Sequence, residues 1–358
     1  MKFVHIADMH FDTSFSQIKD STLGTLRRID QRKVFKKVID YIEENSIDCL
    51  FIAGDLYEHK FIRESTIKFI NEQFERIKNT KVFITPGNHD PYIKNSFYNK
   101  YNWCENVTIF NANISKVELD DVDIYGFGFE DFYMKNSKID ELVIENHEKV
   151  NILITHGSLD GGSDDDRSYN PMTSHKMKQL EFDYIALGHI HKLNLTDENK
   201  KIIYPGSTIS LGFDEPGEHG MIVGNISKNS LNVNFIPLDE SEFVVCDVDV
   251  SNFTTIDELV EKIINLDINP SNYYEIYLVG QRHFDIDLYS LKKMIDINRI
   301  IKIKNKTKLA LDMEKLSNDN TLKGLFVKDI FERMQISSES ERRVLEKALE
   351  IGMEILDK

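Results

Sequence analysis

Short apolar runs of strand length recur along the first half of the chain, and they constrain its fold more than any other feature. Each run is continuous rather than alternating, which is typical of strands that are covered on both faces. Two of the segments between them, residues 34–42 and 67–77, place apolar residues on one helical stripe and so predict covering helices. The runs span residues 3–7, 49–53, 82–85, 123–127, 150–155 and 184–187. This pattern predicts a layered α/β core.

The rest of the chain predicts two further segments. Short strands and turns end at Pro237, where an acidic stretch begins, so the first domain is expected to span residues 1–238. Residues 239–310 predict a smaller α/β domain, and residues 311–358 predict a helical segment. The smaller domain should contain strands at 242–250, 273–279 and 300–303 and helices at 255–266 and 288–297, and the last segment should contain helices at 322–334 and 344–356.

Composition excludes several classes of protein. The chain has 358 residues, of which 41% are hydrophobic and 29% are charged, so it can bury more than one core and is neither disordered nor collagen-like. Its longest apolar runs fall far short of the roughly 18 residues that a membrane-spanning helix requires. The first apolar run reaches Asp8 too early for a secretory signal. We therefore expect a cytoplasmic protein without a membrane partner.

Cysteine spacing and net charge limit the kinds of ligand. Cys49, Cys104 and Cys246 form no Cys-x-x-Cys pair, so they predict reduced structural thiols rather than a disulfide framework or a thiolate zinc site. The net charge is −16, from 44 basic and 60 acidic residues, which argues against wrapping nucleic acid through a generally positive surface. A polyanionic partner must be held locally.

Polar side chains follow five of the predicted strands at the point where each strand ends. Open α/β folds bind their ligands at the carboxyl ends of the strands, so we expect these side chains to gather at one edge of the sheet. Each motif alone is more often turn chemistry or a hydrogen-bonded strand end, and only the full series points to a functional site. The residues are Asp8, His10, Asp55, Asn88, His89, Asp90, His156, His189 and His191.

The number of donors indicates the kind of site. Seven oxygen and nitrogen ligands without sulfur are more than one tetrahedral zinc ion can use, so two metal ions fit the count, with one carboxylate bridging them. Manganese, iron and zinc all suit this mixed donor set, and octahedral demand favours manganese or iron. In two-metal sites with ions roughly 3.5–4 Å apart, a bridging water becomes nucleophilic and both ions withdraw charge from phosphate. The pattern therefore predicts phosphoester hydrolysis.

The remaining histidines are expected to be structural, namely His5, His59, His147, His175, His219 and His283.

These motifs resemble, in order, those of the calcineurin-like metallophosphoesterases, over about residues 1–238. The series is Asp8-x-His10, Gly54-Asp55, Gly87-Asn88-His89-Asp90, His156-Gly157 and Gly188-His189-x-His191. Within this superfamily the likeness extends to the SbcD-type DNA-repair exonucleases, through HIADMHFDTSF at 5–15, DYIALGHIHK at 183–192 and YPGSTISLGFDEPGEHG at 204–220. The resemblance implies a core of two sheets flanked by helices, followed by a capping α/β domain and C-terminal helices.

The resemblance also implies a role for each residue of the site. The first metal ion would be held by Asp8, His10 and His191, the second by Asn88, His156 and His189, and Asp55 would bridge them. The implied catalytic residues are His89, beside the scissile phosphate, and Asp90, which would orient the His89 ring. Glu58 departs from the family pattern, where Asp is common, and is expected to lie behind the ligands. The implied substrate-binding residues are Gly206 and Ser207.

The activity that the resemblance implies is manganese-dependent cleavage of DNA, from 3′ to 5′ on duplex ends and endonucleolytic on single strands, in double-strand-break repair or recombination. A phosphodiesterase acting on nucleotides or other small phosphodiesters shares every ligand and remains an alternative. A noncatalytic scaffold for an ATPase is a second alternative, against which the intact ligand set counts.

Residues 299–308 carry five basic and no acidic side chains, which fits either phosphate contact or a solvated strand face.

The last predicted helix is a candidate surface for docking a protein partner. It carries an apolar stripe near the end of the chain, and in SbcD-type proteins the equivalent region docks the coiled coil of an SbcC-like ABC ATPase. Packing onto the smaller domain and a homodimer contact are the alternatives. The stripe consists of Leu345, Ala348, Leu349, Gly352 and Leu356.

Overall fold

The computed structural model of the chain describes residues 1–15, 18, 21–161, 169–195, 201–310, 316 and 318–356. These residues form two compact units, Met1–Phe243 and Val244–Lys358, and each is described by itself. The finer division at residues 238 and 310 stays a prediction, and residues 311–315, 317, 357 and 358 of the predicted helical segment lie outside the described part. No helix in the described ranges combines the length and apolar character needed to cross a bilayer.

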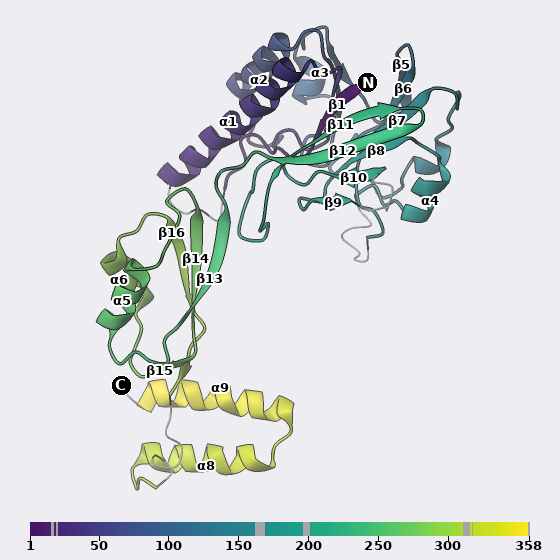
Figure 1. Ribbon diagram of the computed structural model, residues 1–358. Coiled ribbons are helices and arrows are strands. Elements are labelled where there is room, and N and C mark those ends of the chain that lie inside the picture. Colours follow the sequence, from purple (N-terminus) through teal and green to yellow (C-terminus); the bar gives the residue numbers. More distant parts are fainter. Residues whose placement is uncertain are drawn as a thin grey trace. The chain divides into compact units, whose positions relative to one another are not determined.

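Two six-stranded sheets stacked face to face form the first unit (Figure 1). The strand order is β12-β11-β1-β2-β3-β4 in the first sheet and β5-β6-β7-β8-β10-β9 in the second. The first sheet comprises β1 (Lys2–Ile6), β2 (Cys49–Ala53), β3 (Lys81–Thr85), β4 (Val107–Ile109), β11 (Gly220–Ser227) and β12 (Ser230–Pro237). The second comprises β5 (Ser115–Glu118), β6 (Val122–Gly126), β7 (Val150–His156), β8 (Tyr184–Gly188), β9 (Asn194–Leu195) and β10 (Ile202–Tyr204). The helices are α1 (Ser21–Asn45), α2 (Glu64–Arg76), α3 (Phe97–Lys100), η1 (Ile139–Glu141) and α4 (Ser174–Gln179).

The apolar residues of the strands divide between two cores, which is why the runs are continuous. One side of the first sheet packs under α1 and α2, whose apolar stripes include Phe35 and Phe74. The other side meets the second sheet through a layer of large rings, among them Phe3, Phe51 and Tyr184. Burial of both faces favours parallel strands, and β1, β2 and β3 run parallel. Their carboxyl ends therefore reach the same edge. The predicted layered α/β core with two sheets flanked by helices is confirmed.

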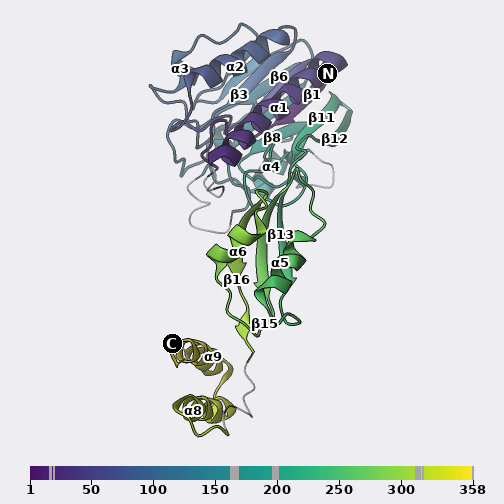
Figure 2. The same ribbon diagram turned by 90° about the vertical axis from the view of Figure 1, so that its left-hand side faces the viewer.

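The second unit is smaller. Its main sheet has the order β13-β14-β16, and α5 and α6 pack together on one face of this sheet (Figures 1 and 2). The predicted smaller α/β fold and helical tail are both present. The elements are β13 (Phe243–Asp249), α5 (Ile256–Ile264), β14 (Tyr273–Val279), β15 (Gln281–Arg282), α6 (Leu288–Ile295), β16 (Ile300–Asn305), β17 (Lys308–Leu309), α8 (Leu322–Ile336) and α9 (Glu339–Leu356).

The basic stretch at residues 299–308 receives an acid from a neighbouring strand. Lys304 Nζ lies 2.7 Å from a carboxylate oxygen of Glu275 on β14, and Lys302 Nζ lies 3.7 Å from the same oxygen. Lys306 Nζ instead lies 3.3 Å from the ring centre of Tyr277. The stretch is therefore partly neutralised by its own sheet, which the sequence order alone does not show.

The last helix begins earlier and packs differently than predicted. Glu341 caps the start of the last helix by accepting the Ser338 N–H at 3.0 Å, and α9 begins at Glu339, earlier than the predicted residue 344. Part of the predicted apolar stripe packs against α8: Leu349 is buried in a cluster with α8, and a Cβ at Gly352 would lie 2.3 Å from the Phe326 ring, whereas Ala348 is exposed. Among the described side chains of α9, the large exposed apolar ones are Val344, Ile351 and Ile355.

Candidate metal centre

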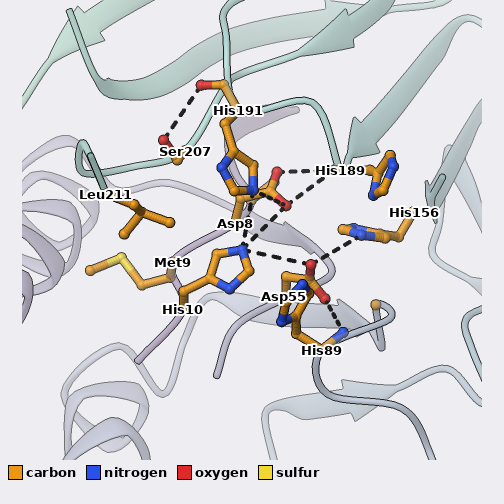
Figure 3. Close-up of polar contacts among 12 residues, drawn as sticks. Asp8, Met9, His10, Asp55, His89, His156, His189, His191, Ser207 and Leu211 are labelled. Carbon is orange, nitrogen blue, oxygen red and sulfur yellow. Dashed lines mark hydrogen bonds and ion pairs between the residues drawn. The ribbon is translucent and has the colours of Figure 1, made fainter. Parts of the chain in front are cut away.

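Several of the predicted site residues lie where strands turn sharply at their carboxyl ends. Asp8 and His10 follow β1, Asp55 follows β2 and His189 follows β8, and their φ angles are 51°, 47°, 51° and 107°. A positive φ costs a residue other than glycine of the order of 1–3 kcal/mol and persists where the surroundings fix it, often at functional sites. Figure 3 shows these side chains pointing toward one another.

Asp8, His10 and His191 form the first cluster. The Nε2 atoms of His10 and His191 lie 3.2 Å apart, and Asp8 Oδ1 lies 4.0 and 3.8 Å from them. Asp8 and His10 are almost completely buried. Three ligand atoms that converge in this way could hold one metal ion. Asp8 also accepts the N–H of His189 at 3.0 Å, which ties this cluster to the next.

A second cluster joins Asp55, Asn88, His156 and His189. His156 Nε2 lies 3.0 Å from Asn88 Oδ1 and 3.3 Å from Asp55 Oδ2. His189 Nδ1 lies 3.2 Å from the same Asn88 oxygen. Asp55 lies between the two clusters, because its Oδ2 is also 3.6 Å from His10 Nε2. The structure thus brings all seven predicted donors together.

The contacts of His156 fit a cation at this edge. Its Nδ1–H donates to the carbonyl of Ala53 at 2.8 Å, so its Nε2 lone pair faces the two oxygens of the second cluster. That arrangement is repulsive unless the ring takes a second proton. Burial opposes the extra charge, but the neighbouring Asp55 carboxylate outweighs it and raises the pKa of His156 to about 9. A divalent cation between these atoms would take the place of that proton, so the donor set fits a metal.

His89 lies beside the clusters and is paired with Glu58. The His89 Nδ1–H donates to Glu58 Oε2 at 3.1 Å, and the His10 Nδ1–H donates to Glu58 Oε1 at 2.7 Å. Burial opposes both charges, but these hydrogen bonds lower the pKa of Glu58 to about 2, and the bond that His89 donates to Glu58 raises the pKa of His89 to about 9. The His89 side chain is 45% exposed, so its charged ring can reach a ligand.

Asp90 is hydrogen-bonded to backbone N–H groups and to a tyrosine, whereas the sequence predicts that it orients the His89 ring. Its buried carboxylate accepts the N–H groups of Gly87 at 2.6 Å and Leu56 at 2.7 Å and the hydroxyl of Tyr98 at 2.6 Å. These bonds join the loops after β2 and β3, and the acid that orients the His89 ring is Glu58. The Glu at that position is long enough to reach two rings at once.

Gly206 and Ser207 lie in the loop between β10 and β11. Both are buried, and the Ser207 hydroxyl lies 2.9 Å from His219 Nδ1 and donates to Glu215 at 3.1 Å. Gly206 has φ +81°, and a Cβ there would lie 2.8 Å from the carbonyl oxygen of His191. Both residues lie behind His191, whose backbone carbonyl accepts the Ser207 N–H at 2.9 Å, so their predicted contact with substrate stays a prediction.

Glu215 is a site residue that the sequence interpretation missed. Its Oε1 accepts the Nδ1–H of His191 at 2.6 Å. Burial opposes its charge, but this bond keeps the pKa of Glu215 below the ordinary value. His219, expected to be merely structural, contacts the same loop. The only signal was the position of Glu215 inside the 204–220 stretch that carries the family resemblance.

A two-sheet α/β fold with paired clusters of histidine and acidic residues at one edge defines a metallophosphoesterase. The model of the calcineurin-like phosphoesterase family matches residues 1–193, more than half of the chain, and the protein belongs to this family. Members depend on a pair of metal ions, and the chain supplies candidate residues to bind them. The predicted family is confirmed.

Individual relatives refine the comparison. The chain is 27% identical over 284 residues to the uncharacterized metallophosphoesterase YhaO of Bacillus subtilis, covering 73% of this chain and 67% of that protein. It is 26% identical over 329 residues to the SbcD subunit of the nuclease SbcCD of Staphylococcus epidermidis, covering 82% of this chain and 83% of that protein. Among solved structures, purple acid phosphatase PPD1 from yellow lupin matches 56% of this chain and 40% of its own, with 14% identity and a TM-score of 0.35.

Proposed function

We propose that the protein is a binuclear metal-dependent phosphodiesterase that cleaves DNA as the nuclease subunit of an SbcCD-like complex. The observation that carries the hydrolytic part is the convergence of seven nitrogen and oxygen donors on one edge, with the cationic His89 ring beside them. The DNA part is supported by the likeness to the SbcD subunit of an SbcCD nuclease along most of both chains.

The seven donors divide between two metal ions. Asp8, His10 and His191 would hold one ion, Asn88, His156 and His189 the other, and Asp55 would serve both. When bound, two such ions make a shared water nucleophilic near neutral pH and neutralise charge on the phosphate. Manganese is the ion that we expect from the donor set.

The chain itself supplies the acid. In the metal-free protein the hydrogen bond to Glu58 raises the pKa of His89 to about 9, and Glu58 accepts the Nδ1–H, so that Nε2 is the ring nitrogen that can face a ligand. A protonated imidazole at that position can donate a hydrogen bond to a phosphate oxygen or a proton to the departing hydroxyl. The positive φ angles at Asp8, His10 and Asp55 hold the neighbouring donors in place.

We propose DNA and an SbcC-like ATPase as partners of the C-terminal part of the chain. We expect residues 239–310 to act as a DNA-binding capping domain in the cytoplasm. We expect the helices of residues 311–358 to dock an SbcC-like ABC ATPase, through the exposed Val344, Ile351 and Ile355 rather than through the stripe that faces α8. A homodimer is the other occupant that this surface would fit.

The test compares substrates and metals directly. Hydrolysis of a linear duplex labelled at either end, of single-stranded DNA and of cyclic dinucleotides is followed with Mn²⁺, Mg²⁺ or Zn²⁺. We expect manganese-dependent shortening of the duplex from 3′ ends and internal cuts in the single strand. Faster hydrolysis of the cyclic dinucleotides would replace DNA with small phosphodiesters, and hydrolysis of no substrate would favour the scaffold.

A further inference from the structure

The loop between β10 and β11 reaches back to the first cluster through one side chain, Glu215. Its carboxylate accepts three hydrogen bonds: from His191 Nδ1 at 2.6 Å, from the Ser207 hydroxyl at 3.1 Å and from the Leu211 N–H at 3.0 Å. The Glu215 side chain is only 11% exposed, against 30% for the His191 side chain. Both oxygens are therefore in use, and only one of them faces the histidine.

The bond to His191 decides which ring nitrogen faces the first cluster. Because a carboxylate only accepts, Nδ1 of His191 carries the hydrogen, and the Nε2 lone pair points toward His10 Nε2, 3.2 Å away. Glu58 does the same for His10 from the other side. Both imidazoles of the first cluster are thus held by a carboxylate, whereas His156 in the second cluster is held by a backbone carbonyl.

The loop that carries Glu215 is held in place by hydrogen bonds to its backbone. The backbone carbonyl of Glu215 accepts from Ser210 Oγ at 3.2 Å and from His219 Nε2 at 3.0 Å. The next anchor is Arg27 on α1, a buried side chain that donates to the Ser210 carbonyl at 2.8 Å and pairs with Asp239. Glu215 is therefore set in position by the fold before any metal binds.

We propose that Glu215 is a positioning residue for the metal ion of the first cluster, acting through the tautomer and orientation of His191, and that Ser207 acts through Glu215. This inference rests on the proposed two-metal site and names a residue that lies outside its ligand set. Carboxylates that hold a metal-binding histidine typically contribute about 10–100-fold in metal affinity.

The experiment measures metal binding rather than turnover. Mn²⁺ is titrated calorimetrically into the full-length metal-free protein, and bound manganese is counted after dialysis. Glu215→Gln keeps the size of the side chain but turns a donating NH₂ toward His191 or toward Ser207 and Leu211, all of which are donors. We expect one of the two binding steps to weaken about 10–100-fold while the other changes less than about twofold. Ser207→Ala should weaken the same step by a smaller factor.

Glu218→Gln is the matched control, because Glu218 is exposed on the same loop and loses the same charge. It should bind two ions as the wild type does. Wild-type affinity for both ions in Glu215→Gln and Ser207→Ala overturns the inference, and so does equal weakening of both steps with a lower thermal transition of the metal-free protein. If the wild type binds two ions but cleaves no phosphodiester, the proposed function fails, while selective loss of one ion in Glu215→Gln still upholds the role of Glu215.

Discussion

Replacing Glu58 with glutamine tests which acid controls His89. The His89 Nδ1–H donates a hydrogen bond to Glu58, and the pKa of His89 stands at about 9 instead of 6.5 because this bond and the charge of Asp55 outweigh burial. Glutamine keeps the shape but not the charge, so the pKa of His89 should fall toward its ordinary value. Because the His89 side chain is 45% exposed, solvent screening reduces the fall, and we expect at least about one pH unit.

The magnitude follows from the fraction of His89 that is protonated. At pH 8, a pKa of about 9 leaves roughly nine rings in ten charged, whereas the ordinary value leaves about 3%. If the charged ring is the acid, Glu58→Gln should lose up to roughly 30-fold in kcat/KM at pH 8, the upper limit being the unscreened shift. At pH 6 both proteins keep most of the charge, so the loss should be below about twofold.

The assay is a pH–rate profile at saturating manganese, joined to NMR titration of the His89 ring in the metal-free protein. Bound metal is counted at each pH, since Glu58 also holds His10. Glu218→Gln is the charge-matched control on an exposed side chain. Equal losses at pH 6 and pH 8, or an unchanged pKa of His89, would refute the assignment of Glu58 as the partner of the ring.

Three further outcomes follow from the structure. His89→Ala should retain both metal ions yet lose turnover, and cleavage of labelled duplex at the wild-type rate would remove His89 from the mechanism. Asp90→Ala leaves several buried donors without their acceptor and should destabilise the first unit by about 3 kcal/mol; fluorescence of the single Trp103, in ring contact with Tyr98, reports the unfolding. Deletion of residues 320–358 should leave cleavage of single-stranded DNA intact but abolish capture of a coiled-coil ATPase, so unchanged capture would reject docking there.

The strands and the donors were predictable because each leaves a local mark. A strand that is buried on both faces requires an uninterrupted apolar run. The run at residues 49–53 therefore predicts the bounds of β2, Cys49–Ala53, correctly. A donor at a strand end needs only its position in the chain, so Asp55 and His156 followed directly from where β2 and β7 stop. Short edge strands such as β5 (Ser115–Glu118), which is half exposed, carry no such run and were missed.

The supporting residues were not predictable in the same way, because their roles depend on contacts between distant segments. Which acid faces the His89 ring is decided by how the loops after β2 and β3 pack, and Asp90, though adjacent in sequence, turns toward backbone N–H groups. Glu215 lies 24 positions from His191, in a loop without periodicity. Ser207 carries a typical ligand-binding side chain but is buried, and burial of one loop residue has no sequence signal.

The glycines in front of the donors have a physical reason that the motifs alone do not state. A Cβ at Gly87 would lie 2.2 Å from Asp55 Oδ1, and one at Gly188 would lie 1.9 Å from the carbonyl oxygen of Ala53. Neither of these two glycines has a left-handed φ, so the requirement there is space rather than backbone freedom. Gly87 lets two loops of the first sheet approach closely, and Gly188 does the same between the two sheets, so that the donors on these loops can converge.

Gly87→Ala tests this reading. The added methyl group must displace the Asp55 carboxylate, the donor between the two clusters, so we expect both manganese ions to bind at least about tenfold more weakly. Gly24→Ala is the matched control: its nearest contact would be 3.9 Å away, in α1, where alanine stabilises a helix by up to about 1 kcal/mol relative to glycine. Calorimetric titration of manganese into both variants compares them. Wild-type affinity in Gly87→Ala would mean that Asp55 does not serve both ions from the position seen here, because the methyl group leaves it no room to stay.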